Sequence, residues 1–263
     1  MSEQQKITVE KEGHLLLIGL NRPEKRNALD LDMYWGLARA FGELHNNPDL
    51  RCGVLFAHGD HFTSGLDLVQ WAPVFAEGKF PDMTDDCIDP FGLDEDRRLK
   101  KPLVMAVQGM CYTYGFELLL TSDVRVAASD LRLAQLEVKR GIYPVGGATV
   151  RMFEEIGWAN AMRYILTGDE MTADEAYRLG LVQEVTEPGK QLDKAIELAT
   201  RIAKAAPLAV QTALRSARIA RVDGARKALS LLLPDMQPLM KSQDAAEGVQ
   251  AFIERREAVF KGC

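Results

Sequence analysis

Short apolar runs typical of β-strands alternate with amphipathic helical patterns through the first two-thirds of this 263-residue chain, and this alternation constrains the fold most strongly. The apolar runs at 54–57 and 103–107 each lead through a loop towards a segment with a helical pattern. Strands connected in this way need crossovers, which give a largely parallel sheet covered by helices. The alternation therefore predicts an α/β fold.

The first hundred residues contain the clearest local patterns. Residues 7–9 and 15–20 have β patterns and flank a predicted turn at Glu12-Gly13, so an N-terminal hairpin is expected. Asp30 precedes an apolar stripe at helical spacing and predicts the start of a helix. The stripe consists of Met33, Leu37, Ala40, Phe41 and Leu44. Residues 72–100 are rich in proline and glycine and predict a mobile, partly helical flap.

The C-terminal part of the chain has a different pattern. After about residue 190 only helical patterns remain, and Asp244 with Glu247 resembles a capping box for the last helix. We therefore expect a core in residues 1–195 and a helical region in residues 196–263. From pattern alone, the apolar face of that region suits a subunit interface or packing on its own core about equally well.

The overall charge and the cysteine pattern limit the classes of partner and compartment. A net charge of −6 gives no general attraction to nucleic acids or to anionic membranes, so neither is an expected partner. The polar N-terminus lacks a signal-peptide pattern, no apolar run is long enough to cross a bilayer, and the cysteines show no C-x-x-C spacing. A cytoplasmic location is therefore predicted. The cysteines are Cys52, Cys87, Cys111 and Cys263.

The loop from His58 to Asp67 lies between a predicted strand and a predicted helix. Backbone amides at such a junction suit an anion or a developing oxyanion, but for the loop by itself an ordinary turn with Asp67 as helix cap is the favoured interpretation. His58, Asp60 and His61 lack a further firm ligand, so no metal site is predicted.

Two glutamates are candidates for chemistry. Glu117 immediately precedes the apolar residues 118–120, where a buried carboxylate needs a task or a partner such as Arg125. Glu137 lies shortly before the glycine-rich stretch Gly141–Gly147, and by itself it reads as a polar residue near a turn. No G-x-G-x-x-G follows a strand, which argues against a Rossmann dinucleotide site.

Taken together, four segments resemble motifs of the crotonase (enoyl-CoA hydratase/isomerase) superfamily, in order and over nearly the whole chain. Residues 21–29 (NRPEKRNAL) are similar to the family's opening motif, and Phe62–Asp67 matches its F-x-x-G-x-D loop. Residues 109–123 match the second glycine-rich element in length, and Gly141–Gly147 is similar to the G-x-x-P-x-G-G turn. Four motifs in order are far more specific than any single one.

The resemblance implies a fold and an activity. The fold is a spiral core of ββα units followed by a C-terminal helical region that packs trimers, commonly paired into hexamers. The activity is that of an enoyl-CoA hydratase of fatty acid metabolism, with coenzyme A as part of the substrate and neither a metal nor a redox cofactor. Isomerisation, hydrolysis or C–C cleavage of an acyl-CoA, or non-catalytic binding of acyl-CoA, are the alternatives, and the acidic charge argues against RNA binding.

The resemblance also implies the residues of the site. The backbone amides of Leu66 and Tyr114 correspond to an oxyanion hole for the thioester carbonyl. Glu117 and Glu137 correspond to the pair that holds a water and adds it across the double bond. The residues that correspond to the coenzyme A site are Lys25, Ala28, Leu66, Asp67, Leu68, Val69 and, from a neighbouring subunit, Lys261.

One departure from the family pattern bears on the substrate. Thr113-Tyr114-Gly115 stands where hydratases of the family usually have a run of glycines. Tyr114 adds bulk that is expected to narrow the acyl pocket, to offer a hydroxyl group or to shift the amide. Without glycine, the backbone is expected to stay in the ordinary φ/ψ regions. For Tyr112 and Tyr143, core packing is favoured over a place in the pocket.

Overall fold

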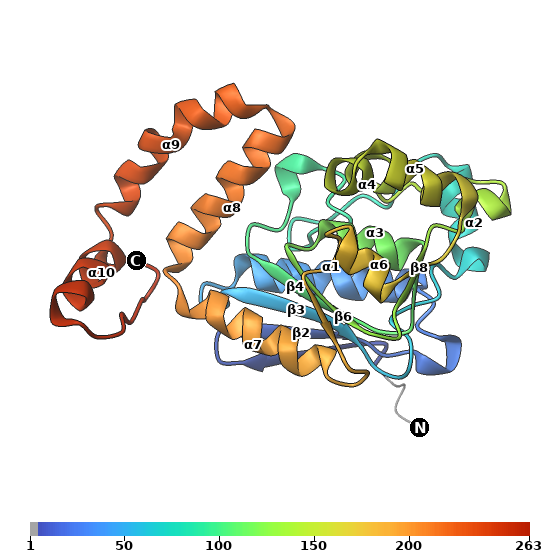
Figure 1. Cartoon of the computed structure of the whole chain (residues 1–263), viewed down its shortest axis with the longest axis horizontal. Helices are drawn as coiled ribbons and strands as arrows, with labels where there is room; N and C mark the ends of the chain where they lie inside the picture. Colours follow the sequence, from blue (N-terminus) through green and yellow to red (C-terminus); the bar gives the residue numbers. More distant parts are fainter. Residues whose placement is uncertain (1–4) are drawn as a thin grey trace.

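The computed structural model describes residues 5–263, and within them a six-stranded sheet forms the centre of the molecule (Figure 1). The strand order is β1-β2-β3-β4-β6-β9; β1 and β2 form the expected antiparallel hairpin, and the other neighbours pair in parallel. These strands are β1 (Ile7–Glu12), β2 (Leu15–Leu20), β3 (Cys52–Ala57), β4 (Leu103–Val107), β6 (Val124–Ala128) and β9 (Glu184–Thr186). The predicted α/β fold with a largely parallel sheet is confirmed.

Helices cover both faces of this sheet (Figure 1). Because side chains of a strand alternate between faces, Leu16 and Ile18 of β2 belong to one buried cluster and Leu15 and Leu17 to the other. The first cluster includes the predicted apolar stripe of α1 (Leu31–Asn46), which starts where the Asp30 carboxylate accepts a hydrogen bond from the Met33 amide. The second cluster includes small residues of α7 (Gln191–Lys204), namely Ala195, Ala199 and Ala203.

A second, three-stranded sheet in the described residues supports the side of the molecule where the motifs lie. It consists of β5 (Met110–Tyr112), β7 (Arg132–Ala134) and β8 (Met171–Thr172), with β5 and β7 parallel. The chain leaves β5 into α3 (Tyr114–Thr121), which carries Glu117. It leaves β7 towards the 3₁₀ helix η3 (Glu137–Arg140), which begins at Glu137. Since parallel strands end at the same edge, the pairing of β5 with β7 brings the two glutamates together.

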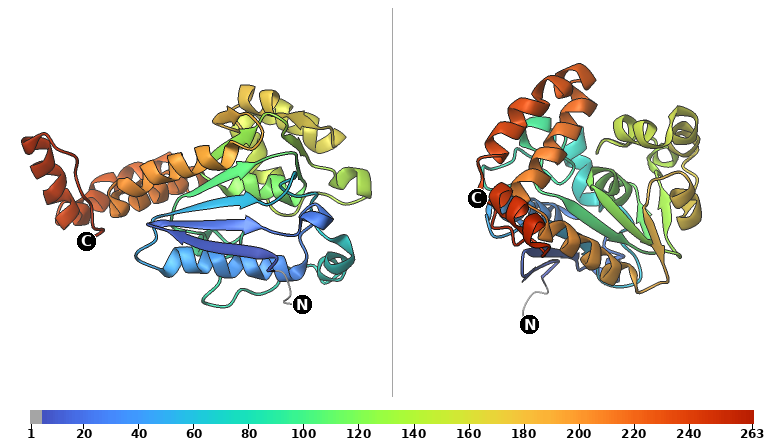
Figure 2. Two further views of the ribbon diagram at one scale, coloured as in Figure 1. Left: turned by 90° about the horizontal axis from the view of Figure 1, so that it is seen from below. Right: turned by 60° about the vertical axis from the view of Figure 1, so that its left-hand side comes forward.

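The remaining helices divide into two groups (Figures 1 and 2). Those around the second sheet and the motif loops are α2 (Leu68–Ala76), α4 (Ala148–Ile156), α5 (Trp158–Thr167) and α6 (Ala173–Arg178), with the 3₁₀ helix η1 (Pro23–Lys25). Those that extend away from the core are α8 (Pro207–Val222), α9 (Ala225–Leu239) and α10 (Gln243–Glu254), hereafter the arm. The 3₁₀ helix η2 (Glu95–Arg97) lies next to α8. The predicted boundary at residue 195 lies inside α7, whereas the chain departs from the core at α8.

The structure corrects two local expectations. The last helix is capped by Ser242, whose hydroxyl accepts from the Ala245 amide, so the predicted capping box is wrong. Asp244 instead accepts hydrogen bonds from the amides of Lys261 and Gly262, and these bonds hold the C-terminal segment against α10. Within the predicted flap, Phe91 is fully buried in the core, so this part of the segment is packed against the body of the protein.

In the part of the chain that the structure describes, no helix combines the length and the apolar character that a membrane crossing requires.

Candidate active site

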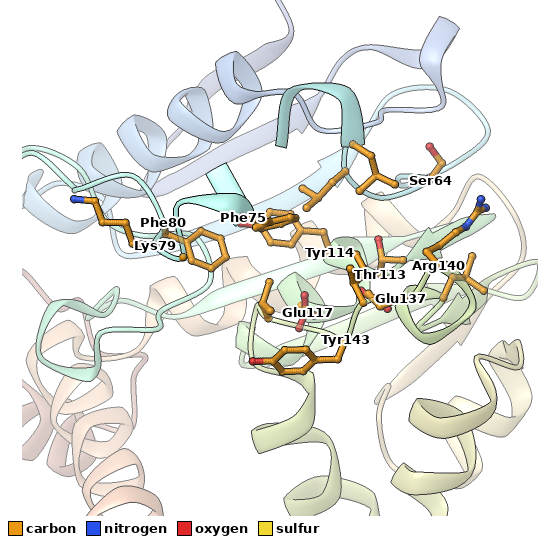
Figure 3. Close-up of a pocket in the computed structure, with 17 residues that line it drawn as sticks. Ser64, Phe75, Lys79, Phe80, Thr113, Tyr114, Glu117, Glu137, Arg140 and Tyr143 are labelled. Atoms are coloured by element: carbon orange, nitrogen blue, oxygen red, sulfur yellow. The ribbon is translucent and has the colours of Figure 1, made fainter. Parts of the chain in front are cut away.

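A cavity of ≈ 760 Å³ opens between the motif loops (Figure 3). One wall comes from the loop before α2 and from residues 75–80, and the other comes from the start of α3 and from residues 136–145. Side chains around it are mostly apolar, and both candidate glutamates line it. The most prominent lining side chains are Leu66, Leu68, Phe75, Phe80, Tyr114, Ile142, Tyr143 and Val145. An apolar cavity with a few convergent polar groups is typical of a small-molecule site.

The amides of Leu66 and Tyr114 come from two segments that lie side by side. The Thr63 amide donates to the Met110 carbonyl, and Thr63 pairs in parallel with Cys111. The approach is so close that a Cβ on Gly65 would clash with the Thr113 hydroxyl, and Gly65 also has a φ of 110°. Glycine is therefore required here.

Both amides are available as donors within the described structure. The Leu66 amide has no hydrogen-bond partner among residues 5–263, although its neighbour Asp67 donates to the Leu29 carbonyl. Tyr114 is the first residue of α3, so its amide has no acceptor within the helix. The helix dipole adds partial positive charge at the same end. The oxyanion-hole role of the two amides stays a prediction.

The backbone at Thr113 contradicts the expectation drawn from the missing glycine. Thr113 has φ 50° and ψ −111°, a conformation that β-branched residues rarely adopt. Its amide donates to the Ala134 carbonyl at 2.7 Å, and its carbonyl accepts from the Glu117 amide at 3.0 Å. These bonds hold Thr113 in a conformation that a glycine would adopt freely, at a cost in backbone strain.

Glu117 lies in the first turn of α3 with only 1% of its surface exposed. The pKa of its carboxyl is raised to about 8, mainly because burial disfavours the charged form. The nearby charge of Glu137 also raises this pKa, whereas hydrogen bonds from the Ala148 and Gly146 amides lower it. The Ala148 amide donates to Oε1 at 3.0 Å. The alternative ion pair with Arg125 does not form, because Arg125 binds Glu155 and the carbonyls of Ser122 and Leu181.

Glu137 lies at the start of η3, and its side chain is also largely buried. Burial raises the pKa of its carboxyl to about 7. The side-chain amide nitrogen of Gln135, oriented to match its neighbours, lies 3.0 Å from both carboxylate oxygens. The sequence analysis assigned no role to Gln135. The feature that could have indicated one is its polar side chain between Ala134 and Leu136, two residues before Glu137.

The two carboxyl groups thus share one cavity, and each has a pKa near neutrality (Figure 3). A group with such a pKa can both accept and donate a proton at physiological pH, which is the requirement for general acid–base catalysis. Two interacting acids lose their protons in steps that belong to the pair. The site can therefore hold one proton between the two glutamates.

The structure places the predicted coenzyme A residues in three positions. Residues 26–29 run beside the motif loop, because the Ser64 amide donates to the Arg26 carbonyl and the Leu29 amide to the Gly65 carbonyl; Ala28 lies in this stretch. Leu66 and Leu68 line the cavity, while Val69 is 86% exposed and Lys25 ends η1 at the surface.

Asp67 and Lys261 both have their side chain or backbone engaged away from the cavity of this chain. Asp67 makes no side-chain cap on α2; its carboxylate binds the Arg22 guanidinium at 3.1 Å. The Lys261 amide donates to Asp244 of α10, and the nearby C-terminus lies on the opposite side of the molecule from α2 and α3, which border the cavity (Figure 1). The predicted role of Lys261 in a neighbouring subunit stays a prediction.

The tyrosines also differ from expectation. Tyr143 is 65% exposed and lines the cavity, so core packing is the wrong interpretation there. Tyr112 binds Glu170 through its hydroxyl and is not among the lining residues. Tyr114 lines the cavity and packs on Phe91, with ring centroids 3.4 Å apart, and its buried hydroxyl has no hydrogen-bond partner in the described structure.

The two loop histidines have structural contacts. His58 Nε2 lies 3.0 Å from the Thr8 hydroxyl, and His61 Nδ1 lies 3.3 Å from the Met110 amide. Among residues 5–263, no group of three histidine, cysteine or acidic side chains is arranged to hold a metal ion.

Comparison with known proteins assigns this arrangement to a family. The family model for enoyl-CoA hydratase/isomerase matches residues 10–263. The chain belongs to the enoyl-CoA hydratase/isomerase family. It is 37% identical over 258 residues to the enoyl-CoA hydratase EchA19 of Mycobacterium tuberculosis, covering 96% of this chain and 95% of that protein. It is 35% identical to the carnitinyl-CoA dehydratase of Salmonella enteritidis, over the full length of both.

Solved structures of the family agree with this assignment. A crystal structure described as a "probable enoyl-CoA hydratase/isomerase" from Mycobacterium abscessus superimposes with a TM-score of 0.94 at 46% identity, covering 98% of this chain and 99% of the other. The predicted membership of the crotonase superfamily and the predicted fold are confirmed.

Proposed function

We propose that this member of the enoyl-CoA hydratase/isomerase family adds water across the 2,3 double bond of an enoyl-CoA. The observation that carries the proposal is the pair Glu117 and Glu137, both buried in one cavity with raised pKa values, beside the amides of Leu66 and Tyr114. The similarity to a protein named as an enoyl-CoA hydratase supports it. Coenzyme A enters as part of the substrate, and the proposed reaction uses no further cofactor.

The proposed mechanism uses each group once. The two carboxyl groups hold a water; one takes a proton from it as the oxygen bonds to C3, and the other gives a proton to C2. Between these events the electron pair of the double bond passes to the thioester oxygen. The amides of Leu66 and Tyr114 stabilise that enolate oxygen, a contact worth about 3 kcal/mol per donor in other enzymes. The net change is one water added to one enoyl-CoA.

The decisive experiment follows the conjugated enoyl absorbance when the purified protein is mixed with enoyl-CoA thioesters of several chain lengths. Hydration removes the conjugation, so the absorbance falls, and a 3-hydroxyacyl-CoA is found as product. An intact fold with no change for any thioester contradicts the proposal. A shifted double bond without added water points to isomerisation instead.

We further propose that the protein is a homo-oligomer, either a trimer or a dimer of trimers, located in the cytoplasm. Large apolar side chains exposed on the arm support the first part, as described in the Discussion. The four free cysteines suit a reducing compartment.

A further inference from the structure

Arg151 is a buried cation to which the mechanism above assigns no task. It lies near the start of α4, and only 6% of its surface is exposed. Among the side chains that the structure describes, no carboxylate forms an ion pair with it. Its guanidinium instead donates to three backbone carbonyls: Phe91 at 2.8 Å, Gly92 at 2.6 Å and Gly146 at 3.2 Å. A charge buried in this way is costly, and its retention calls for a physical reason.

The carbonyl of Gly146 connects Arg151 to Glu117. A Cβ on Gly146 would lie 2.6 Å from Glu117 Oε2, and a Cβ on Gly147 would lie 2.6 Å from Arg151 Nη1. The two consecutive glycines therefore allow the anion and the cation to approach the same short stretch of backbone. The amide of Ala148, one residue further on, donates to Glu117. The turn at Gly146–Ala148 therefore accepts a hydrogen bond from Arg151 and donates one to Glu117.

The other two carbonyls connect Arg151 to the wall of the cavity. Phe91 packs against the ring of Tyr114, whose amide is the proposed oxyanion donor, and against Phe80 at a centroid distance of 6.4 Å. By binding the carbonyls of Phe91 and Gly92, the guanidinium fixes this wall relative to the Gly146 turn. One planar group with several donors thus joins two segments, around Gly92 and Gly146, that are far apart in the sequence.

We propose that Arg151 is a positioning residue, which locks the Glu117 turn to the Phe91 wall and supplies positive charge that favours the ionised form of Glu117. The inference rests on the proposed hydration for its catalytic consequence. The charge of Arg151 acts to lower the pKa of Glu117, against the effects of burial and of Glu137. Around Arg151 itself, the facing charges are those of Arg98, Glu95, Arg221 and Glu117.

The test compares Arg151→Gln and Arg151→Lys with the matched control Arg221→Gln. Arg221 belongs to the same charged neighbourhood but binds Glu154 at the surface and does not contact the turn. The pH midpoint of the Glu117 carboxyl is read from its infrared carbonyl band, identified as the band that Glu117→Gln removes. Arg151→Gln should raise this midpoint, because a positive charge that acts to lower the pKa of Glu117 is lost. The control should leave it unchanged.

The kinetics separate positioning from general folding. Arg151→Gln should lower kcat about 10- to 100-fold with KM changed less than about 3-fold, since Glu117 is misplaced while the coenzyme A contacts remain. Arg151→Lys keeps the charge but loses the planar guanidinium with its several donors. The pH midpoint of Glu117 should therefore stay near that of the parent protein, while kcat still falls about 10-fold.

The outcomes that overturn the inference are specific. An unchanged Glu117 midpoint in folded Arg151→Gln overturns the electrostatic role, and a parental kcat in Arg151→Lys overturns the positioning role. If Arg151→Gln fails to fold, the kcat of Arg151→Lys decides whether Arg151 positions Glu117. If the parent protein hydrates no enoyl-CoA, the proposed function fails, and the infrared midpoints still test Arg151 independently.

Discussion

The core and the arm use apolar side chains in opposite ways. In the core, Leu16 and Ile18 are fully enclosed between the sheet and α1. On the arm, Leu233 is 81% exposed and Phe252 is 85% exposed. Figure 2 shows the arm extending well beyond the sheet. Because exposed apolar surface is unfavourable in water, this difference supports the proposal that the arm packs against another subunit, whereas the core buries its own apolar side chains.

Polar groups show the same contrast. In the core, the buried carboxylates of Glu117 and Glu137 have raised pKa values because burial dominates. On the arm, Glu247 is paired with Arg256, and hydrogen bonds from Arg256 lower the pKa of Glu247 to about 2. Glu117 and Glu137 in the core are therefore suited to proton transfer, whereas Glu247 on the arm forms an ordinary surface ion pair.

The largest effect is expected from Glu117→Gln, which removes the acid but preserves shape. General acid–base groups contribute about 10²- to 10⁴-fold, so kcat for an enoyl-CoA should fall about 1000-fold. Sedimentation should show the same oligomer as the parent protein, since the arm is untouched. A variant that keeps more than a tenth of the parental kcat contradicts the assigned role.

The reverse perturbation is Leu233→Asp combined with Phe252→Asp on the arm. If these side chains are buried between subunits, each change should cost about 2 kcal/mol of association or more. Sedimentation should then show smaller species, while the infrared band of Glu117 keeps its midpoint. Lys227→Ala on the same α9 serves as the control. A parent protein that is already a monomer contradicts the proposed interface.

The pH dependence of stability should distinguish the two regions by sign. The folded pKa values of Glu117 and Glu137, about 8 and about 7, lie above the ordinary value of 4.5. The folded state therefore binds these protons more tightly than the unfolded state. The resulting stabilisation is fully present below about pH 4.5 and is lost as the pH rises towards 8. The free energy of unfolding should therefore fall less steeply between pH 4.5 and 8 for the double variant Glu117→Gln with Glu137→Gln than for the parent protein. Parallel curves for variant and parent contradict the prediction.

Glu247 on the arm should behave in the opposite way. Its folded pKa of about 2 lies below 4.5, so its contribution is present above pH 4.5 and is lost as the pH falls towards 2. The group is exposed, so solvent screening keeps the effect small. Glu247→Gln should make the fall in stability below about pH 4.5 less steep and should shift the curve between pH 5 and 8 by a small constant amount. A changed slope between pH 5 and 8 contradicts this.

A further prediction concerns the unpartnered hydroxyl of Tyr114. Tyr114→Phe should raise the free energy of unfolding by about 1 kcal/mol, because a buried group without a partner is removed. Tyr34→Phe is the control: its hydroxyl lies 3.4 Å from Asp89, so its loss should not stabilise the protein. Chemical denaturation measures both. A destabilised Tyr114→Phe indicates that the hydroxyl has a partner in solution.

Much of the fold was predictable because local patterns and tertiary packing agree. The hairpin, the stripe of α1 starting at Asp30, and the strand–helix alternation all reflect which side chains avoid water. The capping box failed because two candidate caps, Ser242 and Asp244, lie two residues apart, and the C-terminal chain takes up Asp244. That contact joins residues distant in sequence, which no local pattern reveals.

The sequence by itself determined the family, the order of the elements and the two glutamates, because motif spacing is a property of the chain. The tertiary structure decided what those residues experience. It showed that burial raises the pKa of Glu117, that Thr113 adopts the conformation of a glycine, and that Arg151 spans two distant segments. The physical reason is that burial, strain and charge coupling depend on neighbours from several segments, and only the folded chain brings these together.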